Sequence, residues 1–146
     1  MNLYIDWPRL LLGLLLTAPL AMAAGDTSTT PATPTESSSA IVSLLVEAKT
    51  HFEAEDFDQA AAKLERALRI EPHNPILWHN LAGVRLKQQD WKRAAHLAAK
   101  SNTWATPKDK VLRLRNLMII AWACDGMGDT QCAIDARRRA EKLASQ

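Results

Sequence analysis

The chain has 146 residues and a formal net charge of +2, from 18 Lys and Arg against 16 Asp and Glu. This length leaves room for one small domain, and a charge so close to zero argues against nucleic acid as a partner. The sequence holds no Ser-His-Asp arrangement, no Gly-rich phosphate loop and no zinc-type Cys/His spacing. We therefore expect a protein that is not an enzyme and that has no small-molecule substrate, cofactor or metal site.

Residues 1–23 are typical of a secretory signal peptide. Arg9 supplies positive charge, residues 10–20 form a largely apolar run, and Ala21 and Ala23 are small residues at the positions that signal peptidase reads. Cleavage after Ala23 would release the chain into the periplasm, where we expect the protein. An uncleaved membrane anchor is the alternative, but the run is shorter than the roughly 20 apolar residues that span a bilayer.

Residues 24–40 follow as a segment dominated by Ser, Thr and Pro, without an aromatic residue. Such a segment cannot bury enough apolar surface to offset the entropy lost on ordering. We expect it to be a disordered linker, and the folded domain to span residues 41–146.

From Ile41 onward, apolar residues recur at helical spacing, and Ala, Leu, Lys, Arg, Glu and Gln fill the segments. This pattern predicts an all-α domain of six helices joined in pairs. The breaks between helices fall near Glu55-Asp56, Pro72 to Pro75, Gln89-Asp90, Thr106-Pro107 and Gly126 to Asp129.

The segments repeat one another. Asp56-Phe57 corresponds to Asp90-Trp91, and Ala60 to Ala94, each 34 residues apart. A third copy places Ala133 39 residues after Ala94, which predicts an insertion of five residues near Asn102 to Lys110.

A helix–turn–helix period of 34 residues resembles the tetratricopeptide repeat. Trp78, Leu81 and Ala82 match the W-x-x-L-G element of that family, with Ala in place of Gly. The resemblance implies a solenoid of about three helical hairpins, which corresponds here to residues 41–74, 75–108 and 110–146. Small residues such as Ala60 are required where the two helices of a hairpin cross.

In this family the first helix of each pair lines a concave groove that binds peptides. The resemblance places twelve residues there: Leu45, Lys49, Phe52 and Glu53, then His79, Gly83, Leu86 and Lys87, then Arg115, Met118, Trp122 and Asp125. Apolar centres beside basic edges would suit a peptide with apolar and acidic side chains. Phe52 and Leu86 could equally be packing residues. Trp122 is the better anchor, because a terminal repeat has fewer neighbours to cover it.

Three features of the later repeats carry further predictions. Trp104, in the inserted loop, either packs over its hairpin or is a second contact site for a partner. Cys124 and Cys132 flank the last turn of an exported protein, and form either a disulfide or a pair of buried free thiols. Arg137, at a position that faces the next hairpin in earlier copies, indicates that the array ends there.

Charge is unevenly divided along the chain. The first repeat is acidic, whereas thirteen Lys and Arg face six Asp and Glu from Pro75 onward. The basic half could attract an acidic partner or an anionic surface, although most such charges are simply solvated.

The phrase LWHNLA…AAKSN, from residue 77 to residue 102, is similar to the repeat domain of LpoP-type activators of class A penicillin-binding proteins. The resemblance implies that the partner is a bifunctional peptidoglycan synthase of the cell envelope. Those activators are lipoproteins, and this chain lacks the acceptor cysteine, so their membrane attachment is not carried over. The alternatives are a general periplasmic adaptor for secretion, pilus or cytochrome assembly, and a structural module that self-associates.

Overall fold

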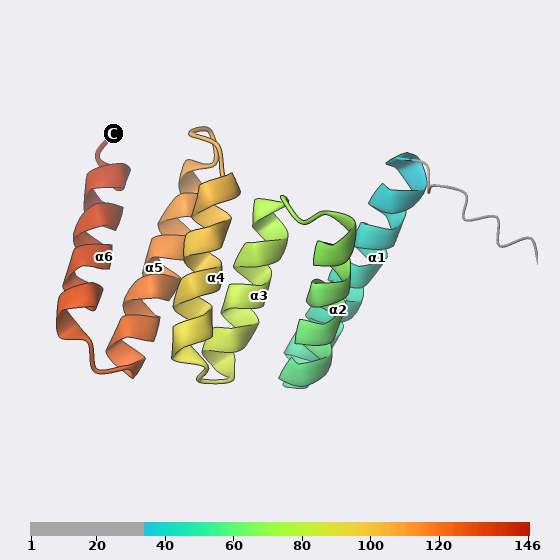
Figure 1. The fold of residues 1–146 in the computed structure, drawn as a ribbon, viewed down its shortest axis with the longest axis horizontal. Coiled ribbons are helices and arrows are strands. Elements are labelled where there is room, and N and C mark those ends of the chain that lie inside the picture. Colours follow the sequence, from blue (N-terminus) through green and yellow to red (C-terminus); the bar gives the residue numbers. More distant parts are fainter. Residues whose placement is uncertain (1–33) are drawn as a thin grey trace, which may run out of the picture. The chain divides into compact units, whose positions relative to one another are not determined.

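The computed structural model of the chain describes residues 34–146, which form six α-helices in a row (Figure 1). The helices are α1 (Pro34–Glu53), α2 (Phe57–Ile70), α3 (Pro75–Lys87), α4 (Trp91–Trp104), α5 (Lys110–Gly126) and α6 (Thr130–Ala144). They pair as three antiparallel hairpins, α1 with α2, α3 with α4 and α5 with α6. The predicted all-α repeat architecture is confirmed.

The predicted signal peptide, and the predicted linker up to residue 33, lie outside the described residues. The rest of that linker was predicted wrongly, because residues 34–40 form the first turns of α1. Pro34 is the first residue of the helix, where its fixed φ suits a helical turn and its missing amide hydrogen costs nothing. The following turn is anchored by the buried Ile41 and Leu44, and adding residues to an existing helix is far cheaper than starting one.

The three hairpins share one turn, built from a left-handed residue followed by an aspartate. Glu55, Gln89 and Gly128 have φ angles of 59°, 60° and 73°. The aspartates that follow them cap α2, α4 and α6 by accepting a hydrogen bond from the backbone N–H three residues on; they are Asp56, Asp90 and Asp129. The backbone N–H of each aspartate also bonds the carbonyl five residues earlier, which satisfies the end of the preceding helix.

This turn gives opposite predictions for two substitutions. A side chain in the left-handed region is strained, whereas glycine adopts it freely. We expect Gly128→Ala to lower the free energy of unfolding by about 1 kcal/mol, and Gln89→Gly to raise it by up to about 1 kcal/mol. Urea denaturation of both variants checks this. A comparable loss of stability in both would contradict the assignment of the turn.

Alanine at the helix crossings lets the two helices of each hairpin approach closely. The alanines at these corresponding positions are all buried: Ala48, Ala82 and Ala121 on the first helices, and Ala60, Ala94 and Ala133 on the second. A larger side chain at such a site would force the helices apart.

Two clusters of buried residues form the core. One joins α1 and α2 to α3, through residues such as Leu44, Leu64 and Leu77. The other joins α3, α4 and α5, through residues such as Ala98 and Ile119. Hairpin two therefore belongs to both clusters. Among the described residues, no helix is long and apolar enough to cross a membrane.

Candidate peptide-binding groove

An open pocket of about 480 Å³ lies between the first helices of the first two hairpins, α1 and α3. Its walls are mostly apolar, and the buried Leu64 and Val84 form its floor. Val46 stands at the edge and is 61% exposed. The pocket thus offers apolar surface to a ligand on the face that the repeat resemblance assigns to binding.

Five of the predicted groove residues line this pocket. They are Leu45, Lys49, Phe52, His79 and Gly83. Phe52 also packs on the first core cluster and contacts the Phe57 ring edge to face, with centroids 5.5 Å apart. Phe52 therefore has both of the roles that the sequence left open: it packs on the core and it lines the pocket.

Gly83 leaves a gap in the wall of the pocket. A Cβ placed on this residue would meet no atom within 4 Å. The absence of a side chain in the middle of a helix weakens the helix, and here it also keeps space free beside His79 and Asn80. Sequence reasoning missed Asn80 and Val46 as lining residues, although each directly follows a predicted one.

The remaining predicted residues of α1 and α3 lie outside the pocket. Glu53 is exposed on α1, where its carboxylate pairs at 3.6 Å with the pocket-lining Lys49 one turn earlier. Leu86 is half-buried against the second core cluster, as its packing interpretation required. Lys87 is exposed at the last position of α3.

The predicted residues of α5 continue on the third hairpin, and none of them lines the pocket. Met118 is half-buried and Arg115 is exposed. Trp122 is 51% exposed, which is a large fraction for a tryptophan. Asp125 is engaged within its own hairpin, where its carboxylate accepts from the Arg137 guanidinium.

A buried polar network joins the pocket-lining His79 to α4 and α5 and was not predicted. Asn116 of α5 is fully buried, and its Oδ1 lies 2.7 Å from Nδ1 of His79 on α3. Its Nδ2 donates to the Ser101 hydroxyl at 2.7 Å and to the Asn102 side-chain oxygen at 2.9 Å. Ser101 in turn donates to the Pro75 carbonyl at 2.7 Å.

This network holds the imidazole of His79 in one orientation at the wall of the pocket. Because the amide of Asn116 donates to two oxygens, its own oxygen accepts from His79, so Nδ1 of the imidazole carries the hydrogen. Three members, His79, Ser101 and Asn102, lie in the LWHNLA…AAKSN phrase. The sequence signal for Asn116 was its place directly before the apolar run LMII, residues 117–120.

Trp104 lies in the last turn of α4, not in the loop where it was predicted. Buried Ser101 and hydrogen-bonded Asn102 hold this turn in helical form, and the helix stops before Pro107, as the geometry of proline requires. The Trp104 ring packs at a tilt on His73, which lies in the loop between α2 and α3, with ring centroids 4.0 Å apart. It remains 39% exposed.

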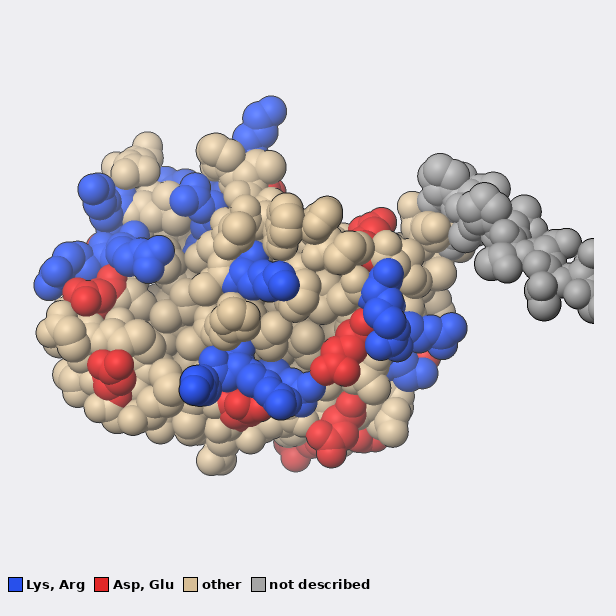
Figure 2. Space-filling model, viewed as in Figure 1, with Lys and Arg blue, Asp and Glu red and all other residues tan. Residues whose placement is uncertain are grey.

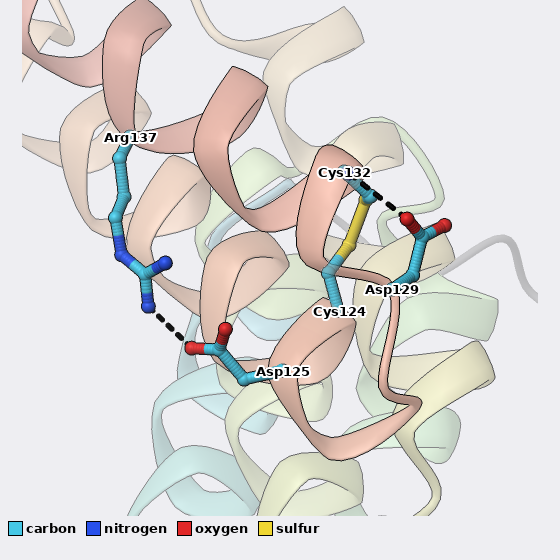
Figure 3. Close-up of a disulfide and its surroundings, with 5 residues drawn as sticks. All are labelled: Cys124, Asp125, Asp129, Cys132 and Arg137. Atoms are coloured by element: carbon cyan, nitrogen blue, oxygen red, sulfur yellow. Dashed lines mark hydrogen bonds and ion pairs between the residues drawn. A yellow bond between two sulfur atoms is a disulfide. The ribbon is translucent and has the colours of Figure 1, made fainter.

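Cys124 and Cys132 form a disulfide across the turn of the last hairpin (Figure 3). Their Cα atoms are 5.7 Å apart, and Cys124 is fully buried. Figure 3 also shows Asp129 capping the start of α6 and Arg137 reaching Asp125. Arg137, predicted to mark the end of the array, is thus paired within its own hairpin.

Ion pairs link neighbouring helices of the first two hairpins. Lys63 of α2 donates to Glu47 of α1 at 2.6 Å, and Arg85 of α3 donates to Glu65 of α2 at 2.6 Å. The Lys63 ammonium, together with a hydrogen bond from Ser43, lowers the pKa of the Glu47 carboxyl. Through α2, these pairs link α1 and α3, the two helices on either side of the pocket.

Comparison with known proteins agrees with this geometry. Residues 51–113 match the tetratricopeptide repeat family. The globular C-terminal domain of LpoP from P. aeruginosa is 33% identical, with a TM-score of 0.67 over 70% of this chain and 95% of that domain. The N-terminal domain of stress-induced protein-1 from C. elegans has the same fold, at 17% identity and a TM-score of 0.65, over 73% of this chain and 86% of that one.

No curated protein matches this chain in a sequence comparison. The family match, the helical hairpins and the identity to the LpoP domain over nearly its full length all agree. The chain therefore belongs to the tetratricopeptide repeat family and is similar to LpoP.

Proposed function

We propose that this protein is a non-catalytic binding module of the bacterial periplasm, which holds a segment of another protein in the pocket between α1 and α3. The pocket carries the proposal. Its apolar lining, Val46 at the rim and the gap at Gly83 leave room for apolar side chains of a bound segment. Removing apolar surface of this kind from water lowers the free energy of the complex and so favours binding.

Trp122 extends the proposed binding surface to α5. Large aromatic side chains that remain exposed in the free protein are frequent anchors of interfaces. A segment that entered the pocket and continued along the first helices would reach it. Lys49 and Lys87 would then lie beside the segment, where they favour carboxylates in it.

As partner we propose a class A penicillin-binding protein, whose glycan polymerisation the bound module would stimulate. The similarity to LpoP supports this choice, because it covers nearly the whole of that globular domain. The phrase around His79 and Asn102 adds to it, since these residues belong to the network that holds the pocket-lining His79.

Gly83 provides a sharp test. We expect Gly83→Trp to fill the pocket and to weaken binding of the synthase from the same organism at least about tenfold. Gly83→Ala is the matched control: it should raise the free energy of unfolding by about 0.5–1 kcal/mol and leave binding unchanged. Titration of the purified synthase, with glycan polymerisation as a second measurement, checks both variants.

Two outcomes would contradict the proposal. If the unaltered protein neither binds nor stimulates the synthase, a class A penicillin-binding protein is not its partner. If the Gly83→Trp variant still melts cooperatively and binds as tightly as the unaltered protein, the pocket is not the binding site.

A further inference from the structure

A second hollow of about 430 Å³ lies on the last two hairpins, between α4, α5 and α6. No residue of α1, α2 or α3 lines it. Because α4 and α6 are the second helices of their hairpins, the hollow is separate from the pocket that the first helices α1 and α3 form. We call it the basic hollow, after the three cations in its lining: Arg113, Arg139 and Lys142.

Within residues 34–146, the ion pairs involve none of these three cations. No Asp or Glu lines it. Among the described residues, the ion pairs of the last hairpin use Arg137 and Arg138 instead, which bind Asp125 and Asp135. Figure 2 shows Lys and Arg gathered at the end of the stack that α6 occupies.

The carboxylate of Asp109, close to the hollow in sequence, is also engaged. It accepts from the hydroxyl and the backbone N–H of Thr106, at 2.7 and 2.8 Å, and these hydrogen bonds lower its pKa. The Asp109 carboxylate therefore bonds within its own turn, and the cations of the hollow can bind an anionic ligand instead.

The floor of the basic hollow is apolar. The buried Leu117 and the half-buried Ile120 come from α5, and Leu143 comes from α6. The rim is held in place because the Lys110 amine, at the start of α5, donates to the carbonyl of Ala144 at the end of α6, at 3.0 Å. A ligand that fits this site carries negative charge and apolar groups together.

We infer that the basic hollow binds an acidic polypeptide segment. Carboxylates of the segment pair with Arg113, Arg139 and Lys142, and an apolar side chain next to them packs on Leu117 and Leu143. Free phosphate or a phosphate headgroup would use the cations and leave the floor exposed. The basic hollow lies apart from the α1–α3 pocket, so this inference does not depend on whether that pocket binds a synthase.

The test is a titration of the ¹⁵N-labelled protein with an end-blocked Leu-Glu-Leu-Asp-Leu peptide, followed through the backbone amides. The amides around residues 113, 139 and 142 should move, and the matched Leu-Gln-Leu-Asn-Leu peptide should bind several-fold more weakly. The double variant Arg113→Gln/Arg139→Gln should lose about three- to tenfold in affinity for the acidic peptide, as expected for two exposed ion pairs. The double variant Arg69→Gln/Lys92→Gln removes the same charge from exposed positions outside the hollow and should bind as the unaltered protein does.

Four outcomes would overturn the inference. Equal weakening in both double variants would indicate general charge attraction. Shifts confined to the α1–α3 pocket would move the peptide to the other site. Inorganic phosphate that shifted the same amides as strongly at the same concentration would make the site one for phosphate. Shifts that depend on protein concentration without peptide would assign the surface to self-association.

Discussion

Replacing Asn116 by alanine is expected to lower the free energy of unfolding by about 2–4 kcal/mol. The side chain is fully buried and hydrogen bonds three partners, His79, Ser101 and Asn102. Alanine would remove all three bonds at once and leave the buried Ser101 hydroxyl with one partner fewer. The expected effect is large because leaving a buried polar group unpaired destabilises the fold by more than the net stabilisation that its hydrogen bond provided.

Urea denaturation of Asn116→Ala measures this effect. Gln131→Ala is a suitable control, because Gln131 is an exposed amide on α6 and its removal should change stability by no more than about 0.5 kcal/mol. A cycle with His79→Ala would isolate the bond between α3 and α5. A loss below about 1 kcal/mol in Asn116→Ala would show that the network does not hold the second and third hairpins together.

Removing the disulfide is expected to cost about 2–3 kcal/mol, because the bond restricts the unfolded chain around a loop of eight residues. For a domain of this size the loss corresponds to a fall in Tm of roughly 10 °C. The α5–α6 hairpin has a neighbour on one side within the described residues, so it has less packing elsewhere to compensate.

The double variant Cys124→Ala/Cys132→Ala and the unaltered protein, each melted with and without a reducing agent, measure the effect. Reduction should lower the Tm of the unaltered protein and leave that of the variant unchanged. Titration of thiols in denatured protein taken from the producing cells is the complementary measurement. Two free thiols there, or equal Tm values throughout, would contradict a stabilising disulfide.

The turns and helix crossings could be predicted from the sequence because they are local and repeat. Asp56 and Asp90 cap helices at the spacing that the 34-residue period gave, and Ala60 and Ala94 are buried as small crossing residues must be. The start of α1 was misplaced, since helix extension into a polar segment depends on the anchoring of the turn that follows.

The site was less accessible from the sequence because it depends on how separate helices meet. Asn116 joins partners from α3 and α4, and nothing in its own segment names them. The pocket exists because α1 and α3 stand apart above Leu64 and Val84, whereas α3 contacts α5 directly. A helical period places residues on a face, but it does not give the spacing between two faces.

Photocrosslinking in living cells tests the central claim, that the first helices form the binding surface for another protein. A photoreactive amino acid would replace Val46, at the edge of the pocket, and separately Trp122, with the exposed position Arg69 on α2 as control. We predict that positions 46 and 122 capture the same polypeptide, a class A penicillin-binding protein, and that position 69 does not. Capture of that synthase from position 69 alone, or of different proteins from positions 46 and 122, would contradict the claim.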